Sequence, residues 1–301
     1  MKRILTLFLM IGLLYCLPGC GLKNPEVVST KPETIETAAP DTYPEAPDST
    51  EPPTDYQLPL IAVSAPPMEE VFTDANGTVL LCYTYQDLRL TLKDPVTADA
   101  ISLDFLNLLD PMGAACEEIL QSAKLESQNA TNWSPYRFSK FFTPMRLDNG
   151  ILSMYGVQIL SDSTGKASST GISLTYDLLT GQRLTLAQIL REGIAIDALD
   201  QAVIDSLSSA ATEGILYDDY AQTISSLFSS NSLVENWYLS ENGLCFFFDP
   251  YEIAPYSAGT VIAEIPYSAL TRVLKEAYFP EETVVLTGFI TMEAFAGMEA
   301  D

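Results

Sequence analysis

Ten of the chain's 19 prolines lie between residues 21 and 67, and this segment limits how much of the chain can fold. Glu, Thr, Ser and Asp separate the prolines, as in KPETIETAAPDTYPEAPDSTEPPTD. Such a composition has too little apolar surface to form a core, and its acidic residues repel one another. We therefore expect residues 20–67 to be a disordered, partly extended tether, with the folded part beginning near residue 68.

The first 20 residues have the pattern of an export signal. Two basic residues precede an apolar run over 4–17, which is shorter than a usual membrane span. The run ends in Leu17-Pro18-Gly19-Cys20, which resembles the bacterial lipobox, where the cysteine is acylated and becomes the new first residue. We expect residues 1–19 to be removed and Cys20 to be lipidated, which anchors the protein to the outer face of the bacterial cell membrane. The alternative is an ordinary signal peptide with a chance cysteine.

The part that follows the tether is strongly acidic. Of the 301 residues 47% are apolar, which is enough to bury a core in one or two domains. Residues 60–301 carry 32 acidic and 11 basic side chains, a charge of −21. This charge argues against nucleic acid as a partner, and it permits a basic protein, a cationic peptide or a cation. The plainer alternative is that the charge serves solubility.

The chain contains no histidine, which excludes several kinds of active site. Ser-His-Asp and Cys-His nucleophilic sites and the common zinc sites all need an imidazole. The glycine motifs that bind phosphates or dinucleotides are also missing. We therefore expect no metal, no cofactor and no catalytic residue, and a protein that is not an enzyme. Cys82, Cys116 and Cys245 are odd in number and irregularly spaced, so buried free thiols are expected, although one disulfide remains possible.

Strand patterns occur in runs and helical patterns in separate blocks. Two strands are expected over 78–92, with Gln86-Asp87 as the turn between them, and hairpins around Asn149-Gly150 and Asn242-Gly243. Apolar residues at helical spacing predict helices over 101–109, 113–127, 196–207 and 217–228, and a last one containing Leu270, Val273 and Leu274. The arrangement predicts an α+β fold of antiparallel sheets built from hairpins with packed helices.

The segment FFFDPYEIAPYSAGTVIAEIPY, residues 246–267, combines an aromatic strand with a proline-rich corner. Proline cannot donate to a strand ladder, so Pro250 and Pro255 require the strand to end near Phe248, and Gly259 permits the chain to return. Tyr251 and Tyr256 are expected to pack their rings together while their hydroxyls stay solvated or bonded. The corner is therefore read first as a bend.

Two groups of residues are candidates for a site. In the corner, Asp249 and Glu252 could form a carboxylate pair of the glycosidase type, but a turn or cap role is the plainer interpretation. Upstream, Trp133, Tyr136 and Phe138 could form an exposed aromatic edge for a ligand. The alternation of Tyr136, Phe138 and Lys140 fits a half-buried strand better. The binding candidates are Trp133, Tyr136, Phe138, Asp249, Tyr251, Glu252 and Tyr256.

The stretch LCFFFDPYEIAPYSAGTVIAEIPYSAL resembles a C-terminal domain of unknown function found in the extracellular part of the RsiV anti-sigma factor and beside the catalytic domain of the peptidoglycan deacetylase PdaC. The preceding ISLTYDLLTGQRLTLAQIL resembles its companion N-terminal domain. The resemblance implies a PdaC-like domain at 68–192 and an RsiV C-terminal-like domain at 193–301. In RsiV this part is a receptor for lysozyme, a basic protein.

Three functions follow as hypotheses. The first is a cell-surface binding module for lysozyme or another basic protein, acting as an inhibitor or a sensor. The second is a module that binds peptidoglycan or another glycan. The third, and the weakest, is a glycoside hydrolase that uses the corner carboxylates.

Overall fold

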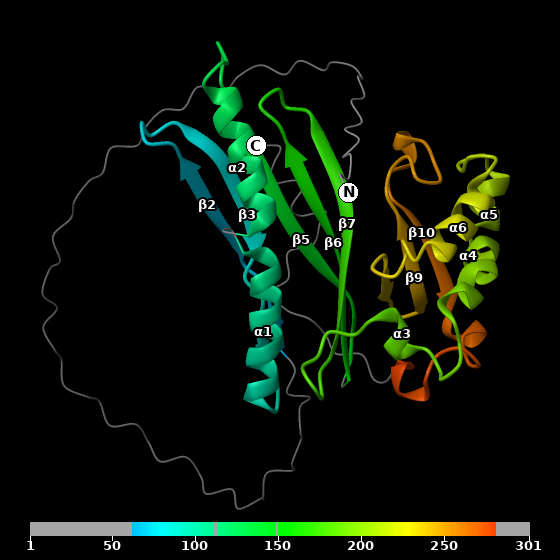
Figure 1. Cartoon of the computed structure of the whole chain (residues 1–301). Coiled ribbons are helices and arrows are strands. Elements are labelled where there is room, and N and C mark those ends of the chain that lie inside the picture. Colours follow the sequence, from blue (N-terminus) through cyan, green and yellow to red (C-terminus); the bar gives the residue numbers. More distant parts are fainter. Residues whose placement is uncertain (1–61, 111–112, 149, 281–301) are drawn as a thin grey trace, which may run out of the picture. The chain divides into compact units, whose positions relative to one another are not determined.

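The computed structural model describes residues 62–110, 113–148 and 150–280 (Figure 1). The expected signal, Cys20 and the tether up to residue 61 lie outside these residues, as does the stretch after Pro280. All of the described residues belong to one compact unit, Asp55–Asp301. Within them, no helix is long and apolar enough to cross a membrane.

The strands form three sheets, and the fold class is α+β as predicted. Five strands pair in the order β2-β3-β5-β6-β7, three in the order β10-β9-β8, and β1 pairs with β4. The strands are β1 (Ala62–Ser64), β2 (Pro67–Thr73), β3 (Val79–Gln86), β4 (Arg89–Thr91), β5 (Tyr136–Leu147), β6 (Ile151–Ser161), β7 (Ala167–Asp177), β8 (Trp237–Leu239), β9 (Gly243–Phe248) and β10 (Val261–Pro266).

Short and long helices connect the strands. The α-helices are α1 (Pro95–Leu109), α2 (Ala114–Ser127), α3 (Leu186–Ile189), α4 (Asp200–Ser206), α5 (Ser208–Thr212) and α6 (Tyr220–Ser229). Single 3-10 turns are η1 (Ile196–Leu199), η2 (Tyr256–Ala258), η3 (Tyr267–Ala269) and η4 (Glu276–Tyr278).

The five-stranded sheet confirms one predicted hairpin and corrects another. β5 and β6 pair antiparallel on either side of residues 148–150, as the Asn-Gly turn predicts. The expected hairpin around Gln86-Asp87 is wrong, because β3 pairs with β2 and β5 whereas β4 pairs with β1. The pairing of β3 with β5 is parallel, and α1 and α2 lie in the connection between the two strands. Parallel neighbours need such a long crossover, which a local turn pattern does not reveal.

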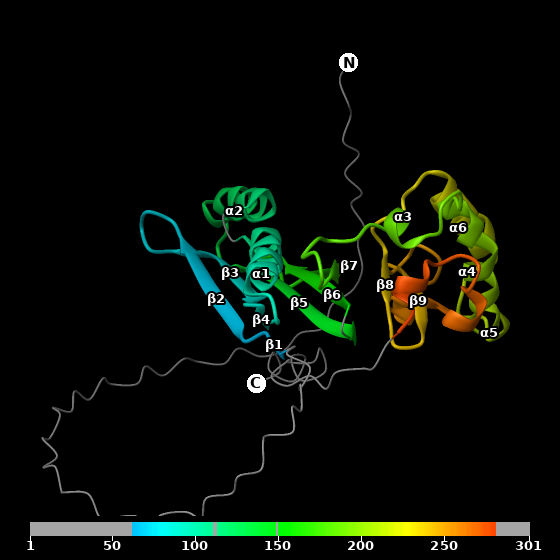
Figure 2. The same ribbon diagram turned by 90° about the horizontal axis from the view of Figure 1, so that it is seen from below.

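Helices α1 and α2 lie on the same face of this sheet (Figure 2). α1 begins after Asp94, whose side chain accepts a hydrogen bond from the N–H of Val96, and Pro95 occupies the first turn, where it costs no hydrogen bond. Its buried face carries three of the apolar residues predicted from helical spacing, Ile101, Phe105 and Leu109, whereas the fourth, Leu108, is exposed. This face packs with the inward side chains of the strands in one core of Tyr83, Ile101, Phe105, Leu109, Phe138 and Phe142.

Helices α4 and α6 pack with the three-stranded sheet in a second core. β8 and β9 form the hairpin predicted around Asn242-Gly243. Every second residue of β9 joins the helices in the core, with Val203, Leu207, Ile224, Phe228, Leu244, Phe246 and Phe248 all buried. The alternate residues of β9 face the five-stranded sheet, where Phe247 lies against Tyr155 at 5.1 Å between ring centroids.

Two predictions, a helix near residue 270 and the start of the folded part, need correction. The expected helix around residues 270–274 is absent from the described chain, which has the 3-10 turn η3 followed by a bridge between Leu190 and Leu274. Leu270 and Leu274 are buried in the second core, and Val273 packs against it partly buried. The fold also begins earlier than residue 68, with β1 at Ala62–Ser64. Prolines are tolerated here because Pro67 is the first residue of an edge strand.

The three cysteines of the folded part are free thiols, as expected. Cys116 and Cys245 are buried, and Cys82 is half-buried. Burial raises the pKa of the Cys245 thiol to about 12. No disulfide links the sheets, so packing and hydrogen bonds hold them together.

Candidate functional site

The corner between β9 and β10 comprises residues 249–260, and short hydrogen bonds hold it. The backbone N–H of Asp249 donates to Glu252 Oε2 at 2.7 Å, and the N–H of Glu252 donates to the carbonyl of Asp249 at 3.1 Å. The N–H of Tyr251 donates to the carbonyl of Ala254 at 3.1 Å. β9 ends at Phe248 and β10 begins at Val261, which confirms the predicted bend.

One carboxylate of the corner is bound to the other sheet. Asp249 Oδ1 accepts the backbone N–H of Gly171, on the edge strand β7, at 2.7 Å. A Cβ on Gly171 would lie 2.5 Å from the Phe247 ring, so only glycine allows this approach. Asp249 and Glu252 are therefore engaged in structural hydrogen bonds of the kind that a turn or cap makes.

Burial raises the pKa of both corner carboxyl groups above their usual values. For Asp249, desolvation outweighs the hydrogen bond from Gly171. For Glu252, desolvation outweighs the hydrogen bond from the Asp249 N–H, and the charge of Asp249 raises the pKa further. Among the described residues, no group of three His, Cys, Asp or Glu could hold a metal ion.

The raised pKa values predict a pH dependence of stability. In the folded state the carboxyl groups of Asp249 and Glu252 stay protonated to higher pH than in the unfolded chain. Their contribution to stability is therefore complete below about pH 4, and it is lost as the pH rises through their folded pKa values. We expect Asp249→Asn/Glu252→Gln, which keeps both acceptor oxygens, to lose less stability than the wild type between pH 4 and pH 7. Urea unfolding at both pH values measures this.

The matched control is Asp197→Asn/Glu213→Gln, which makes the same charge change at two exposed carboxylates. It should lack the specific effect of the corner pair. Equal pH profiles for the corner variant and this control would contradict the assignment of the pH dependence to the corner.

The corner presents two exposed tyrosines. The rings of Tyr251 and Tyr256 stack at 5.5 Å between centroids, as predicted, and the two residues are 67% and 56% exposed. Tyr251 has φ +75°, a left-handed conformation that is strained for a bulky residue. The corner therefore holds a pair of aromatic rings in solvent at a conformational cost, and local strain of this kind is concentrated at functional sites.

The burial of Tyr136 and Phe138 excludes the alternative of an exposed aromatic edge at residues 133–138. Tyr136 and Phe138 lie on β5 and are buried, and Trp133 is half-buried with its Nε1–H donating to the carbonyl of Val79 at 2.7 Å. Tyr136 donates its hydroxyl to Glu126 at 2.8 Å. α1 and α2 cover this face of the strand, so the alternation reports a buried strand, the interpretation favoured above. These rings belong to the core.

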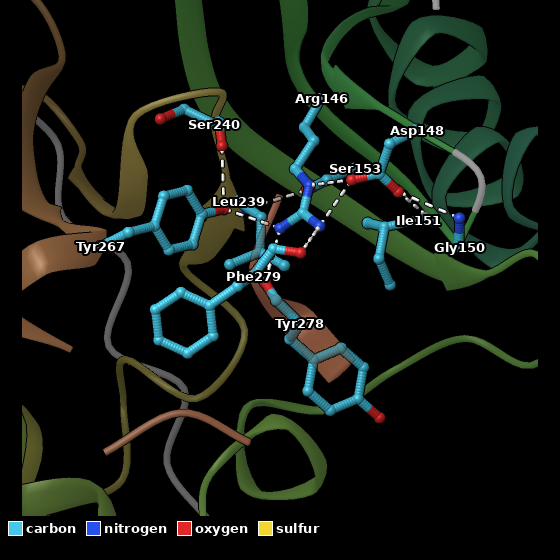
Figure 3. A network of polar contacts seen from close by, with 10 residues as sticks. All are labelled: Arg146, Asp148, Gly150, Ile151, Ser153, Leu239, Ser240, Tyr267, Tyr278 and Phe279. Carbon is cyan, nitrogen blue, oxygen red and sulfur yellow. Dashed lines mark hydrogen bonds and ion pairs between the residues drawn. The ribbon is translucent and has the colours of Figure 1, made fainter. Parts of the chain in front are cut away.

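A buried arginine, which the sequence did not single out, joins the two sheets (Figure 3). Arg146 and Asp148 form an ion pair of 2.6 Å with both side chains 2% exposed. The guanidinium also donates to the hydroxyl of Tyr267 at 2.8 Å and to the carbonyls of Tyr278 at 2.6 Å and Phe279 at 3.0 Å. Asp148 Oδ1 accepts the N–H groups of the hairpin turn at Gly150 and Ile151. We call these residues the arginine cluster.

A strand irregularity places this arginine. The register between β5 and β6 shifts between Pro144 and Arg146, and such a bulge re-aims the next side chain. The sequence carries only a weak indication of this bulge, a proline within the strand two residues before the arginine. Besides Asp148, the partners of Arg146 are more than 100 residues away along the chain, so only the folded structure shows that the arginine binds them.

The corner lies in the part of the chain that matches a known family. Residues 187–268 match the model described as "Protein of unknown function (DUF3298)". This segment is therefore similar to a DUF3298 domain. It holds helices α4 to α6, the hairpin β8-β9 and the corner up to β10. No match to the chain was found among curated proteins.

One solved structure of a DUF3298 protein shares the fold. A family member from Bacteroides fragilis superposes with a TM-score of 0.53 at 16% identity, covering 72% of this chain and 94% of that one. A family protein from Pseudomonas aeruginosa gives a TM-score of 0.45 at 15% identity, covering 74% of this chain and 98% of that one. At 16% identity, the likeness to the Bacteroides fragilis structure concerns the fold alone. It covers a larger share of the chain than the segment 187–268.

Proposed function

We propose that this protein is a non-catalytic binding module of the bacterial cell surface, and that the corner of its DUF3298 domain contacts a basic protein such as lysozyme. The exposed, stacked pair Tyr251–Tyr256 carries the proposal. Tyrosine is enriched at the centres of protein interfaces because its large rigid ring loses little entropy on binding. The hydrogen bonds of the corner hold the pair in place before a partner arrives.

Charge supports a basic partner. With 32 acidic and 11 basic side chains in residues 60–301, at least 21 carboxylates have no basic partner in that region even if every base takes one. This excess speeds the encounter with a cationic protein and makes binding weaker at high salt. The resemblance of residues 244–270 to the RsiV receptor domain supports lysozyme as the first partner to test.

Binding of lysozyme to the purified chain tests the proposal. Isothermal titration at moderate salt should give saturable binding that weakens as salt rises. Tyr251→Ala/Tyr256→Ala should weaken it by about 30-fold, since truncating central interface aromatics typically costs about 2 kcal/mol or more. Leu179→Ala, which removes a 78% exposed apolar side chain outside the corner, should leave it unchanged. Absence of saturable binding would overturn the proposal, and cosedimentation with peptidoglycan would then test the glycan alternative.

The location of the module is part of the proposal. We expect Cys20 to carry the acyl chains and residues 20–61 to separate the domain from the membrane. Metabolic labelling of cells with a clickable fatty acid should label the wild-type chain and not Cys20→Ala. Labelling of both chains, or of neither, would reject lipidation at this residue.

A further inference from the structure

A cavity of about 220 Å³ opens at the edge strand β7, beside the C-terminal end of α1. Its apolar lining comes from the helix and the sheet, with Leu108, Phe142, Ile172 and Leu174. The volume is several times the roughly 30 Å³ that one water molecule occupies in the liquid. It is below the roughly 300 Å³ at which pockets for drug-sized ligands begin. The cavity is therefore suited to a small molecule.

Two cations line this cavity in an otherwise acidic fold. Lys140 projects from β5 and Arg183 follows β7. Within the ranges that the structure describes, neither side chain takes part in an ion pair. Lys140 donates to the carbonyl of Leu108 at 3.1 Å and lies over the Phe138 ring at 5.4 Å, and burial lowers its pKa. The guanidinium of Arg183 makes no hydrogen bond to any described residue, so all of its donors are open to a ligand.

The remaining polar lining supplies the opposite charge and neutral hydrogen-bonding groups. Glu235 lies in the segment before β8. The Ser173 hydroxyl donates to the Glu235 carbonyl at 3.0 Å and so fixes this segment at the edge of β7. Gln158 and Asn236 add two amide side chains. None of these three side chains has a hydrogen-bond partner among the described residues. Two positive groups and one negative group thus line one small space.

We propose that this cavity binds a free amino acid or a dipeptide in its zwitterionic form. The ligand carboxylate would lie against Arg183 and Lys140, because a guanidinium fork matches carboxylate geometry. Its ammonium would lie against Glu235, and its side chain on the apolar lining. A simple inorganic anion would use the two cations but would be repelled by Glu235. The cavity adjoins the corner at Gly171, but Arg183, Lys140 and Glu235 lie outside the corner, and the proposal does not depend on the proposed function.

Calorimetric titration of the full chain in detergent tests the proposal with three small probes. Alanyl-alanine carries both charges, N-acetylalanine only the carboxylate, and alaninamide only the ammonium. We expect saturable binding of alanyl-alanine at one site, weaker binding of N-acetylalanine, and the weakest binding of alaninamide. Absence of saturable binding of alanyl-alanine up to about 10 mM would overturn the proposal, since weaker affinities fall outside those of specific small-ligand sites.

Three variants locate the binding. Arg183→Gln changes an exposed side chain with no bonded partner, so the fold should be retained, and affinity for alanyl-alanine should fall at least about tenfold. Arg272→Gln makes the same charge change at an exposed arginine outside the cavity and should have no effect. Glu235→Gln should weaken the binding of alanyl-alanine but not that of N-acetylalanine, which has no ammonium group. Equal affinities for the Arg183→Gln and Arg272→Gln variants would place the ligand elsewhere and reject the site.

Discussion

Replacing Arg146 by methionine is expected to lower the free energy of unfolding by about 3–5 kcal/mol, because removing one partner of a buried ion pair leaves the other charge uncompensated. Asp148 would then be a buried carboxylate without its guanidinium partner, although the hydrogen bonds from the hairpin turn would remain. The Tyr267 hydroxyl and the carbonyls of Tyr278 and Phe279 would also lose their donor. Chemical denaturation with a fluorescence readout measures the change.

The chain provides a matched control in Arg89→Met. Arg89 pairs with Asp87 at 2.8 Å, also two residues apart, but its side chain is 70% exposed. Exposed pairs contribute about 0–1 kcal/mol, so this variant should be close to the wild type. Equal stabilities of Arg146→Met and Arg89→Met would show that the arginine cluster does not hold residues 278–279 against the β5-β6 hairpin.

Replacing Phe247 by alanine should destabilise the protein by about 3–5 kcal/mol, the usual cost of truncating a core phenylalanine. Phe247 is fully buried between the two sheets, against the Tyr155 ring and above Gly171. Its loss would leave a cavity at the contact that also positions Asp249. Thermal unfolding should show a lower midpoint, and the lost contact should also weaken any binding at the corner.

Ile262→Ala is the control for this truncation. Ile262 is the antiparallel partner of Phe247 on β10 and is 44% exposed. Its truncation should cost clearly less, since its side chain is still partly in water when the protein is folded. If Ile262→Ala lowered the free energy of unfolding as much as Phe247→Ala, the effect at Phe247 could not be assigned to its contact between the two sheets.

Local patterns predicted much of the fold. The Asn-Gly hairpins at residues 149–150 and 242–243 and the helices over 101–109 and 113–127 were predicted because their signals are local. The strand at 78–86 was also predicted, but its neighbour was wrong. It pairs with β2 and β5 instead of β4, and β5 begins 50 residues after β3 ends. A strand sequence carries no mark of the strand with which it pairs across a crossover.

The candidate sites also divide into those that a local sequence pattern marks and those that only the folded structure shows. The corner was found from Pro250, Pro255 and Gly259, since backbone geometry restricts which residues can occupy a bend. The aromatic residues at 136 and 138 were candidates for exposure because alternation alone does not say which face is covered. The arginine cluster and the cavity at β7 each join residues distant along the chain, and no local pattern marks either one.

The sequence by itself determined the acidity of the folded part, the absence of imidazole chemistry, the α+β class and the bend after β9, because composition, periodicity and proline act locally. Only the tertiary structure decided that Arg146 is buried against Tyr267, that Gly171 makes room for Phe247, and that Lys140, Arg183 and Glu235 line one cavity. These are properties of contacts between distant segments, and their energies depend on burial and partners that exist only once the chain has folded.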